Sequence, residues 1–148
     1  MTVAVNDPSA VITSSTLPAG MTLTSSGGVA IISGTPTTAK AAMTISLTAK
    51  DGNQVVKTSF TVAVYAAPTL AVTGATSLTH LRSFTLSVKA TGLLASTITT
   101  DGLPEGLSYS STTGKITGVV KAVGRHQFSV IATNSVGRTT TIVSITVS

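Results

Sequence analysis

Gly114 and Lys115, followed closely by Thr117, look like part of a nucleotide-binding loop. A phosphate-binding loop needs an earlier glycine, a lysine followed directly by Ser or Thr, and a helix behind it. Here Tyr109 occupies the position of the earlier glycine, Ile116 follows the lysine, and the next residues alternate as in a strand. The sequence therefore predicts a hairpin turn at Gly114 and no nucleotide site.

Other residues that could carry chemistry are few and scattered. The chain has four acidic residues, two histidines and no cysteine. Asp101 and Glu105 flank a Leu-Pro turn, which favours solvated turn residues over a carboxylate pair held for acid–base work. His80 and His126 are too few for most zinc sites, and no serine lies in a nucleophile motif. We predict a non-enzymatic protein with no catalytic, cofactor or metal site.

The composition favours strands and limits the ligands. The apolar residues are mostly Val, Ile, Ala and Leu and the polar ones mostly Thr and Ser, and β-branched residues fit a pleated surface better than a helix. The net charge is +5, but the nine basic residues form no run and no aromatic residues lie between them, which argues against nucleic-acid binding. No apolar run reaches the roughly 20 residues that cross a bilayer, so no membrane insertion is expected. Carbohydrate stays open as a ligand, although the chain has no Trp and two Tyr.

The same phrase occurs twice in the chain. Leu17–Met21 reads Leu-Pro-Ala-Gly-Met, and Leu103–Leu107 reads Leu-Pro-Glu-Gly-Leu. The last alternating segment of each copy, Ser59–Val64 and Val143–Ser148, matches as well. Repeats of this kind indicate tandem domains, and the extended Ala-Pro connector places the boundary near Ala66. The predicted domains are 1–66 and 67–148.

Each copy shows the pattern of a β-sandwich. Phe84, Leu86 and Val88 alternate with polar residues, which predicts a strand with one buried face. Short alternating segments of this kind are separated by Gly-rich and Asn/Asp-rich turns throughout both copies. The sequence therefore predicts an all-β protein made of two tandem sandwiches.

The two copies differ at their beginnings. Copy two has a strand at Thr69–Gly74 before the strand at Arg82–Ala90, whereas copy one begins with Met1–Val5, which aligns with the second of these. Copy one thus lacks its first strand. The absence would leave unpaired backbone groups along an edge, which is a hazard unless another segment covers it. The residues of this predicted edge are Thr2, Val3, Ala4 and Val5.

These motifs together resemble the bacterial immunoglobulin-like (cadherin-like) repeat family. The matching segments are Leu103–Leu107, Gly114–Gly118 and Ala132–Asn134 in copy two, and Leu17–Met21, Ile32–Pro36 and Ala49–Asp51 in copy one. The resemblance covers nearly the whole chain and implies immunoglobulin-like sandwiches that act as spacer or binding modules on surface-exposed proteins, without catalysis. Relatives similar to cadherins bind calcium, which takes about six to eight oxygen ligands, so four acidic residues predict no such site here.

Basic residues are concentrated in copy two. Lys115, Lys121, Arg125 and Arg138 make a candidate basic face that could dock on an acidic surface. Ordinary solubilising charge is the alternative interpretation.

Two hypotheses about function follow. The first is a structural or display protein of a virion, a bacteriophage decoration or tail accessory protein assembled in the host cytoplasm, because Met1–Ala10 contains no export signal. Its partners would be other protein subunits of the particle, one of which supplies the missing strand. The alternative is a repeat pair from a large bacterial adhesin, exposed on the cell surface as a spacer or as a module that binds cells or carbohydrate.

Overall fold

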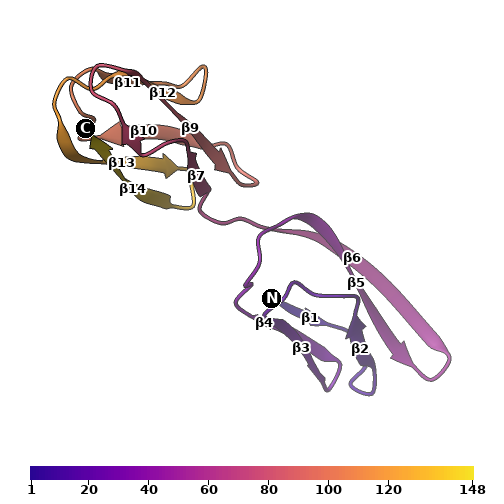
Figure 1. Ribbon diagram of the computed structural model, residues 1–148. Helices are drawn as coiled ribbons and strands as arrows, with labels where there is room; N and C mark the ends of the chain where they lie inside the picture. The colour runs from indigo at the N-terminus through magenta and orange to yellow at the C-terminus, as the bar shows by residue number, and fades with distance from the viewer. The chain divides into compact units, whose positions relative to one another are not determined.

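The computed structural model describes all residues, Met1–Ser148, which divide into two compact units, Met1–Tyr65 (unit 1) and Ala66–Ser148 (unit 2). Ala66, near which the sequence places the boundary, is the first residue of unit 2. Strands are the only regular elements of both units (Figure 1). No helix is long and apolar enough to cross a membrane.

Unit 1 is a sandwich of two three-stranded antiparallel sheets. Its strands are β1 (Thr2–Ala4), β2 (Val11–Ser14), β3 (Met21–Ser26), β4 (Val29–Gly34), β5 (Lys40–Asp51) and β6 (Gln54–Val64). One sheet has the order β1-β4-β3 and the other the order β2-β5-β6. Because successive side chains of a strand point to opposite faces, alternate apolar residues meet between the sheets. Ile32, Ile45 and Leu47 form the buried centre of this core.

Unit 2 is a sandwich of two four-stranded sheets. Its strands are β7 (Thr69–Thr73), β8 (Ser77–Leu78), β9 (Ser83–Thr91), β10 (Thr97–Asp101), β11 (Leu107–Ser110), β12 (Lys115–Val119), β13 (Gly124–Thr133) and β14 (Arg138–Val147). The sheet orders are β11-β12-β9-β7 and β10-β13-β14-β8, and β8 runs parallel to β14. The all-β sandwich fold predicted from the alternation is confirmed.

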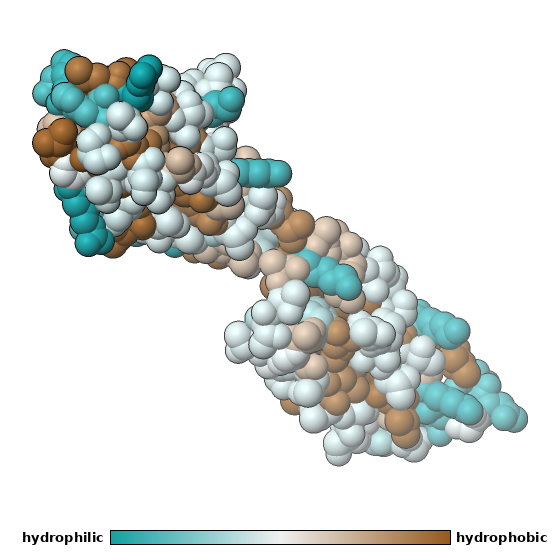
Figure 2. All heavy atoms as spheres, in the orientation of Figure 1, coloured by the Kyte–Doolittle hydropathy of each residue, from teal (hydrophilic) through white to brown (hydrophobic).

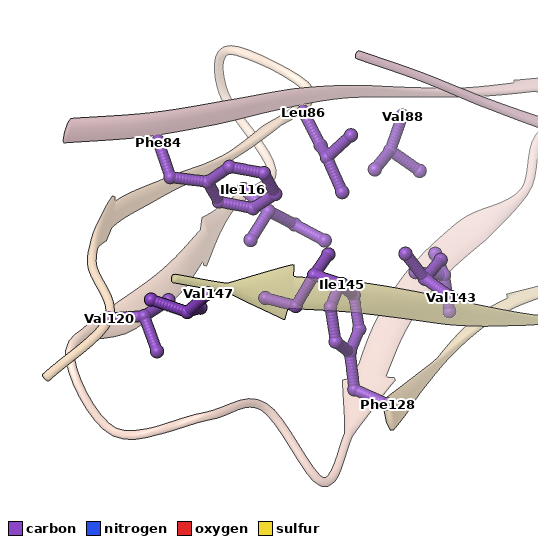
Figure 3. Close-up of a cluster of buried hydrophobic side chains, with 10 residues drawn as sticks. Phe84, Leu86, Val88, Ile116, Val120, Phe128, Val143, Ile145 and Val147 are labelled. Carbon is purple, nitrogen blue, oxygen red and sulfur yellow. The ribbon is translucent and has the colours of Figure 1, made fainter. Parts of the chain in front are cut away.

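The core of unit 2 contains ten clustered buried side chains, against three in unit 1. Figure 3 shows Phe84, Leu86 and Val88 of β9 pointing toward Val143 and Ile145 of β14. These are the alternate residues that the sequence assigns to the buried face of each strand.

The two units share one strand plan with one difference. The order β3-β4-β1 in unit 1 corresponds to β11-β12-β9 in unit 2, and β2-β5-β6 corresponds to β10-β13-β14. The register agrees as well, because Met21 pairs with Gly34 as Leu107 pairs with Gly118. Unit 1 has no counterpart of β7 or β8. The first strand that sequence comparison finds absent from copy one is therefore absent from the sandwich.

Candidate functional site

The repeated phrase builds a turn and a hairpin. The amide of Leu107 donates to the carbonyl of Pro104 over 3.1 Å, and β11 and β12 pair as an antiparallel hairpin closed at Gly114, whose φ is +65°. Ile116 is fully buried, while Lys115 is exposed on the opposite face of β12. The predicted hairpin turn at Gly114 is confirmed.

Two glycines of this phrase lie against the backbone of the segment opposite. Gly106 and Gly118 have φ values of +92° and +143°, and a Cβ on either would overlap a backbone carbonyl oxygen, that of Val119 or of Gly106 respectively. The amide of Val119 also donates to the carbonyl of Gly106 over 3.1 Å. The motif therefore brings two backbone segments into direct contact, which only glycine permits at this φ and distance.

Four titratable side chains of unit 2 have local partners. Lys121 Nζ lies 2.7 Å from Glu105 Oε1, and both side chains are largely exposed. The hydrogen bond and the charge of Lys121 lower the pKa of the Glu105 carboxyl, and the same contact raises the pKa of Lys121. His80 Nε2 and His126 Nε2 each lie within hydrogen-bond distance of a backbone carbonyl oxygen, that of Lys121 or Ala122.

Two acidic residues that the sequence does not connect lie near each other in unit 1. Asp7, in the loop after β1, and Asp51, at the end of β5, line one small pocket of about 140 Å³ with Gln54. Hydrogen bonds from the side chain and the amide of Ser9, followed by one to Asp51, lower the pKa of Asp7. No group of three or more His, Cys, Asp or Glu comes together anywhere in the chain.

The four residues of the candidate basic face are not gathered on one surface. Arg125 pairs with Thr146 near one end of the β13–β14 hairpin, and Arg138 pairs with Thr133 at the other end. Lys115 begins β12 in the other sheet, and Lys121 is in the ion pair with Glu105. These residues are dispersed surface charges and do not form one basic face.

The predicted edge of unit 1 lies at β1, which pairs with β4 and with no other strand. Met1 and Ile32 exchange two backbone hydrogen bonds of 2.9 Å, and the amide of Val5 donates to Gly28 over 2.9 Å. In an antiparallel pair, every second residue directs its backbone N–H and C=O groups toward the partner strand. Thr2 and Ala4 consequently turn their backbone N–H and C=O groups away from β4, toward the open side.

A second open edge lies at the end of β6. In unit 2 the end of β14 is bonded to the β8 segment, since Thr146 N donates to Thr76 O over 2.8 Å and Ser148 N donates to Leu78 O over 2.9 Å. Unit 1 contains no strand beside β6 other than β5. Unit 1 is thus open along one edge of each sheet, at the positions that β7 and β8 fill in unit 2.

Side chains beside these edges are incompletely covered. Met1 holds the same register position as Leu86, because Met1 pairs with the buried Ile32 and Leu86 pairs with the buried Ile116. Met1 is nevertheless 61% exposed, whereas Leu86 is 1% exposed. Val3 is half-exposed, whereas Val88 at the same position is buried. In Figure 2 hydrophobic residues, in brown, reach the surface of the unit drawn in indigo to magenta in Figure 1.

The last strand shows the same contrast. Phe60, Val62 and Val64 of β6 are half-exposed, and their counterparts in β14 are all buried. Those counterparts are Val143, Ile145 and Val147. In unit 2 the segment β7–β8 supplies Leu70, Val72 and Leu78, which pack against this core. The sequence alone revealed the open edge, but it did not reveal that the core beneath the edge is uncovered.

Comparisons with known proteins agree with this architecture. The model of the family described as "Putative Ig domain" matches residues 2–65 and again 67–148. No curated protein sequence matches the chain.

Several solved structures share the fold. The N-terminal eight Ig domains of Down Syndrome Cell Adhesion Molecule align with a TM-score of 0.62 and 13% identity, over 96% of this chain and 21% of that chain. Extracellular domains 3–5 of Drosophila OTK align with a TM-score of 0.56 and 14% identity, over 100% of this chain and 62% of that chain. Ig domains 1–4 of Sidekick-1 align with a TM-score of 0.51 and 12% identity, over 95% of this chain and 40% of that chain.

This chain spans less than two thirds of the length of each of these three structures. Identities this low show the fold alone. The family pattern, in contrast, is matched twice over nearly the whole chain, and both units have the sandwich that it requires. The protein therefore belongs to the Putative Ig domain family, as two tandem immunoglobulin-like modules.

Proposed function

We propose that the protein is a structural subunit that joins a larger assembly through unit 1, and that this assembly is a virion, in which the chain serves as a decoration or tail accessory protein. The observation that carries the proposal is the pair of open sheet edges above a half-exposed core. An edge of this kind favours association with other chains, and proteins that remain free in solution usually block it.

The chemistry of the chain supports a role without catalysis. Its four acidic residues form one exposed ion pair, one small pocket with two carboxylates and one exposed strand end, at Asp101. Catalysis needs acid–base or nucleophilic groups arranged together around a substrate, and the small pocket that Asp7 and Asp51 share is lined otherwise by Gln54 and apolar residues, with no His, Lys or Ser. Assembly through surfaces fits these features better than turnover of a substrate.

The virion proposal is tested by its location. Particles purified through a density gradient from a producing lysate should contain the chain in a fixed ratio to the major structural protein, as measured by quantitative mass spectrometry. Antibody against unit 2 should label the intact particles. A chain that stays entirely in the free protein fraction would rule out the virion role.

A repeat pair of a bacterial surface adhesin is the second candidate. Tandem modules in one chain favour it, because solved relatives of this fold also carry several Ig domains in series. This candidate predicts that the protein fractionates with the cell envelope and is removed from intact cells by external protease. The virion proposal predicts neither result, so the two experiments separate the candidates.

A further inference from the structure

The position beside β1 and β6 has a known occupant in unit 2. There the ten-residue segment Thr69–Leu78 first pairs antiparallel with β9 and then parallel with β14, so that it closes both sheets at once. Leu70, Val72 and Leu78 of this segment lie against the core. The second unit of the chain therefore shows what kind of segment fits the open position of the first.

The register relates the two positions residue by residue. Ser87 and Lys89 of β9 pair with Thr73 and Ala71 of β7. Thr2 and Ala4 hold the same positions in β1, because Ile31 pairs with Thr2 as Lys115 pairs with Ser87. The backbone groups that Thr2 and Ala4 turn outward are thus those that receive β7 in a completed sandwich.

We infer that unit 1 is an acceptor for an extended strand supplied from outside residues 1–148, and that this donor strand resembles Thr69–Leu78. This inference rests on the proposed assembly function and names its partner by chemistry. The donor is an extended segment with apolar residues at alternate positions. The first apolar residue faces Val5, the second faces Val3, and a third lies near Val64.

The donor also needs a glycine at its middle. Gly74 has a φ of +148°, and a Cβ there would overlap the Leu86 side chain. In unit 1 the corresponding neighbour is Met1. The positive φ at this position therefore favours glycine in the donor.

A second copy of the chain is a weaker occupant. Its own β7–β8 segment already closes unit 2, so donating that segment would open one edge for each edge it covers. Antiparallel pairing of β1 with β1 of another copy would satisfy Thr2 and Ala4 but would leave the end of β6 and the half-exposed Val62 and Val64 uncovered. A separate donor satisfies both edges.

The test uses the full chain and a synthetic peptide with the sequence of Pro68–His80. We expect the peptide to slow amide hydrogen exchange of Thr2, Ala4 and the end of β6 by at least about tenfold, with no change at Ser87, whose partner is already present. A peptide with Leu70→Ser and Val72→Ser should give no protection. Exchange unchanged by the native peptide overturns the inference.

Variants of the acceptor make the test specific. Ala4→Pro removes an outward N–H, which an edge strand tolerates, and should lower peptide affinity at least about tenfold, roughly the 1.4 kcal/mol that such a factor represents. Ala4→Val keeps the N–H and should bind as the native chain does. Equal binding by all three chains would mean that the peptide does not pair with β1.

Light scattering tests the competing occupant. A monomer in the absence of peptide supports the inference, whereas a dimer that Ala4→Pro dissociates assigns the edge to a second copy and overturns it.

The test of the virion role is independent of the peptide-binding test. Peptide binding with no chain in particles would contradict the proposed function alone, and chain in particles without peptide binding would contradict this inference alone.

Discussion

Gly106 and Gly118 decide the geometry of the repeated phrase at the scale of single residues. Each has a positive φ and touches backbone at the place where a side chain would begin. The same pair recurs in unit 1 as Gly20 and Gly34, at φ values of +87° and +119°. The phrase therefore recurs because two chain segments must approach within backbone contact in each sandwich.

Replacement of Gly106 by Ala should destabilise unit 2 by at least about 2 kcal/mol, because strain at positive φ costs on the order of 1–3 kcal/mol and the overlap with Val119 adds to it. Urea unfolding followed by hydrogen exchange and mass spectrometry measures the loss in unit 2 peptides. Gly124→Ala is the matched control, since Gly124 has a φ of +112° with open space around it. Equal losses in the two variants would show that backbone contact at Gly106 is unimportant.

The Glu105–Lys121 pair makes a prediction about pH. Because Lys121 lowers the pKa of Glu105, the pair stabilises the folded state above the unfolded carboxyl pKa, and this contribution is lost as the pH falls through the lowered folded pKa. Lys121→Met should raise the Glu105 pKa toward its ordinary value in a carbon-detected NMR titration.

The exposed Lys115→Met variant is the control for that titration and should leave the Glu105 pKa unchanged. Both partners of the pair are largely exposed, so the thermal midpoint at neutral pH should barely move. A large drop in the midpoint with Lys121→Met would contradict this assignment of a weak surface pair.

At the scale of elements, the two units provide matched positions with and without a covering strand. Val88 of β9 is buried beside β7, and Val3 of β1 holds the same register position half-exposed. Removing two methylene equivalents from a buried site costs about 0.8 kcal/mol each, before any cavity is counted. Val88→Ala should therefore cost roughly 2 kcal/mol, and Val3→Ala less than half of that.

Denaturant titrations that resolve each unit by hydrogen exchange measure this difference. A saturating donor peptide should raise the cost of Val3→Ala toward that of Val88→Ala, since it would bury Val3. Equal costs in the free chain would show that Val3 is already covered, contrary to the open edge.

Amide exchange of the free chain provides a direct measure of the edge. Thr2 and Ala4 face no strand, whereas Ser87 and Lys89 face β7. Exposed strand edges exchange by small local openings, so we expect the first two amides to exchange much faster than the second two. Comparable protection of all four amides would mean that the β1 edge is covered in the free protein.

At the scale of the whole molecule, the cores differ in size. Unit 1 contains six buried apolar side chains and unit 2 contains eleven. Small sandwiches bury a modest fraction of their surface and are marginally stable. The unit that lacks β7 and β8 therefore has less apolar burial to offset the conformational entropy of its chain.

We expect thermal unfolding in two steps, with unit 1 first. Hydrogen exchange during a temperature series, or calorimetry analysed for two transitions, measures the order, and Tyr65 and Tyr109 provide one NMR reporter for each unit. Val62→Ala should lower the first transition alone, and Ile145→Ala the second. A single cooperative transition that both variants shift equally would contradict this expectation.

Particular elements show how far sequence reasoning reached. The alternation of Phe84, Leu86 and Val88 predicted β9 and its buried face, because a strand with one wet side must alternate. The two-residue strand β8 was not foreseen, since it pairs in parallel with β14, a partner nearly seventy residues away. The pocket at Asp7 and Asp51 was missed for the same reason, because a loop and a strand end meet there only after folding.

The sequence by itself determined the all-β class, the two tandem modules, the glycine turns and the absence of a first strand in copy one. These are local or repeated properties, because turn geometry and strand periodicity depend on residues that are close together in the sequence. Only the tertiary structure decided what the absent strand means for the core. Burial depends on contacts between distant segments, so identical residues such as Val3 and Val88 are partly or fully buried according to whether a strand lies beside them.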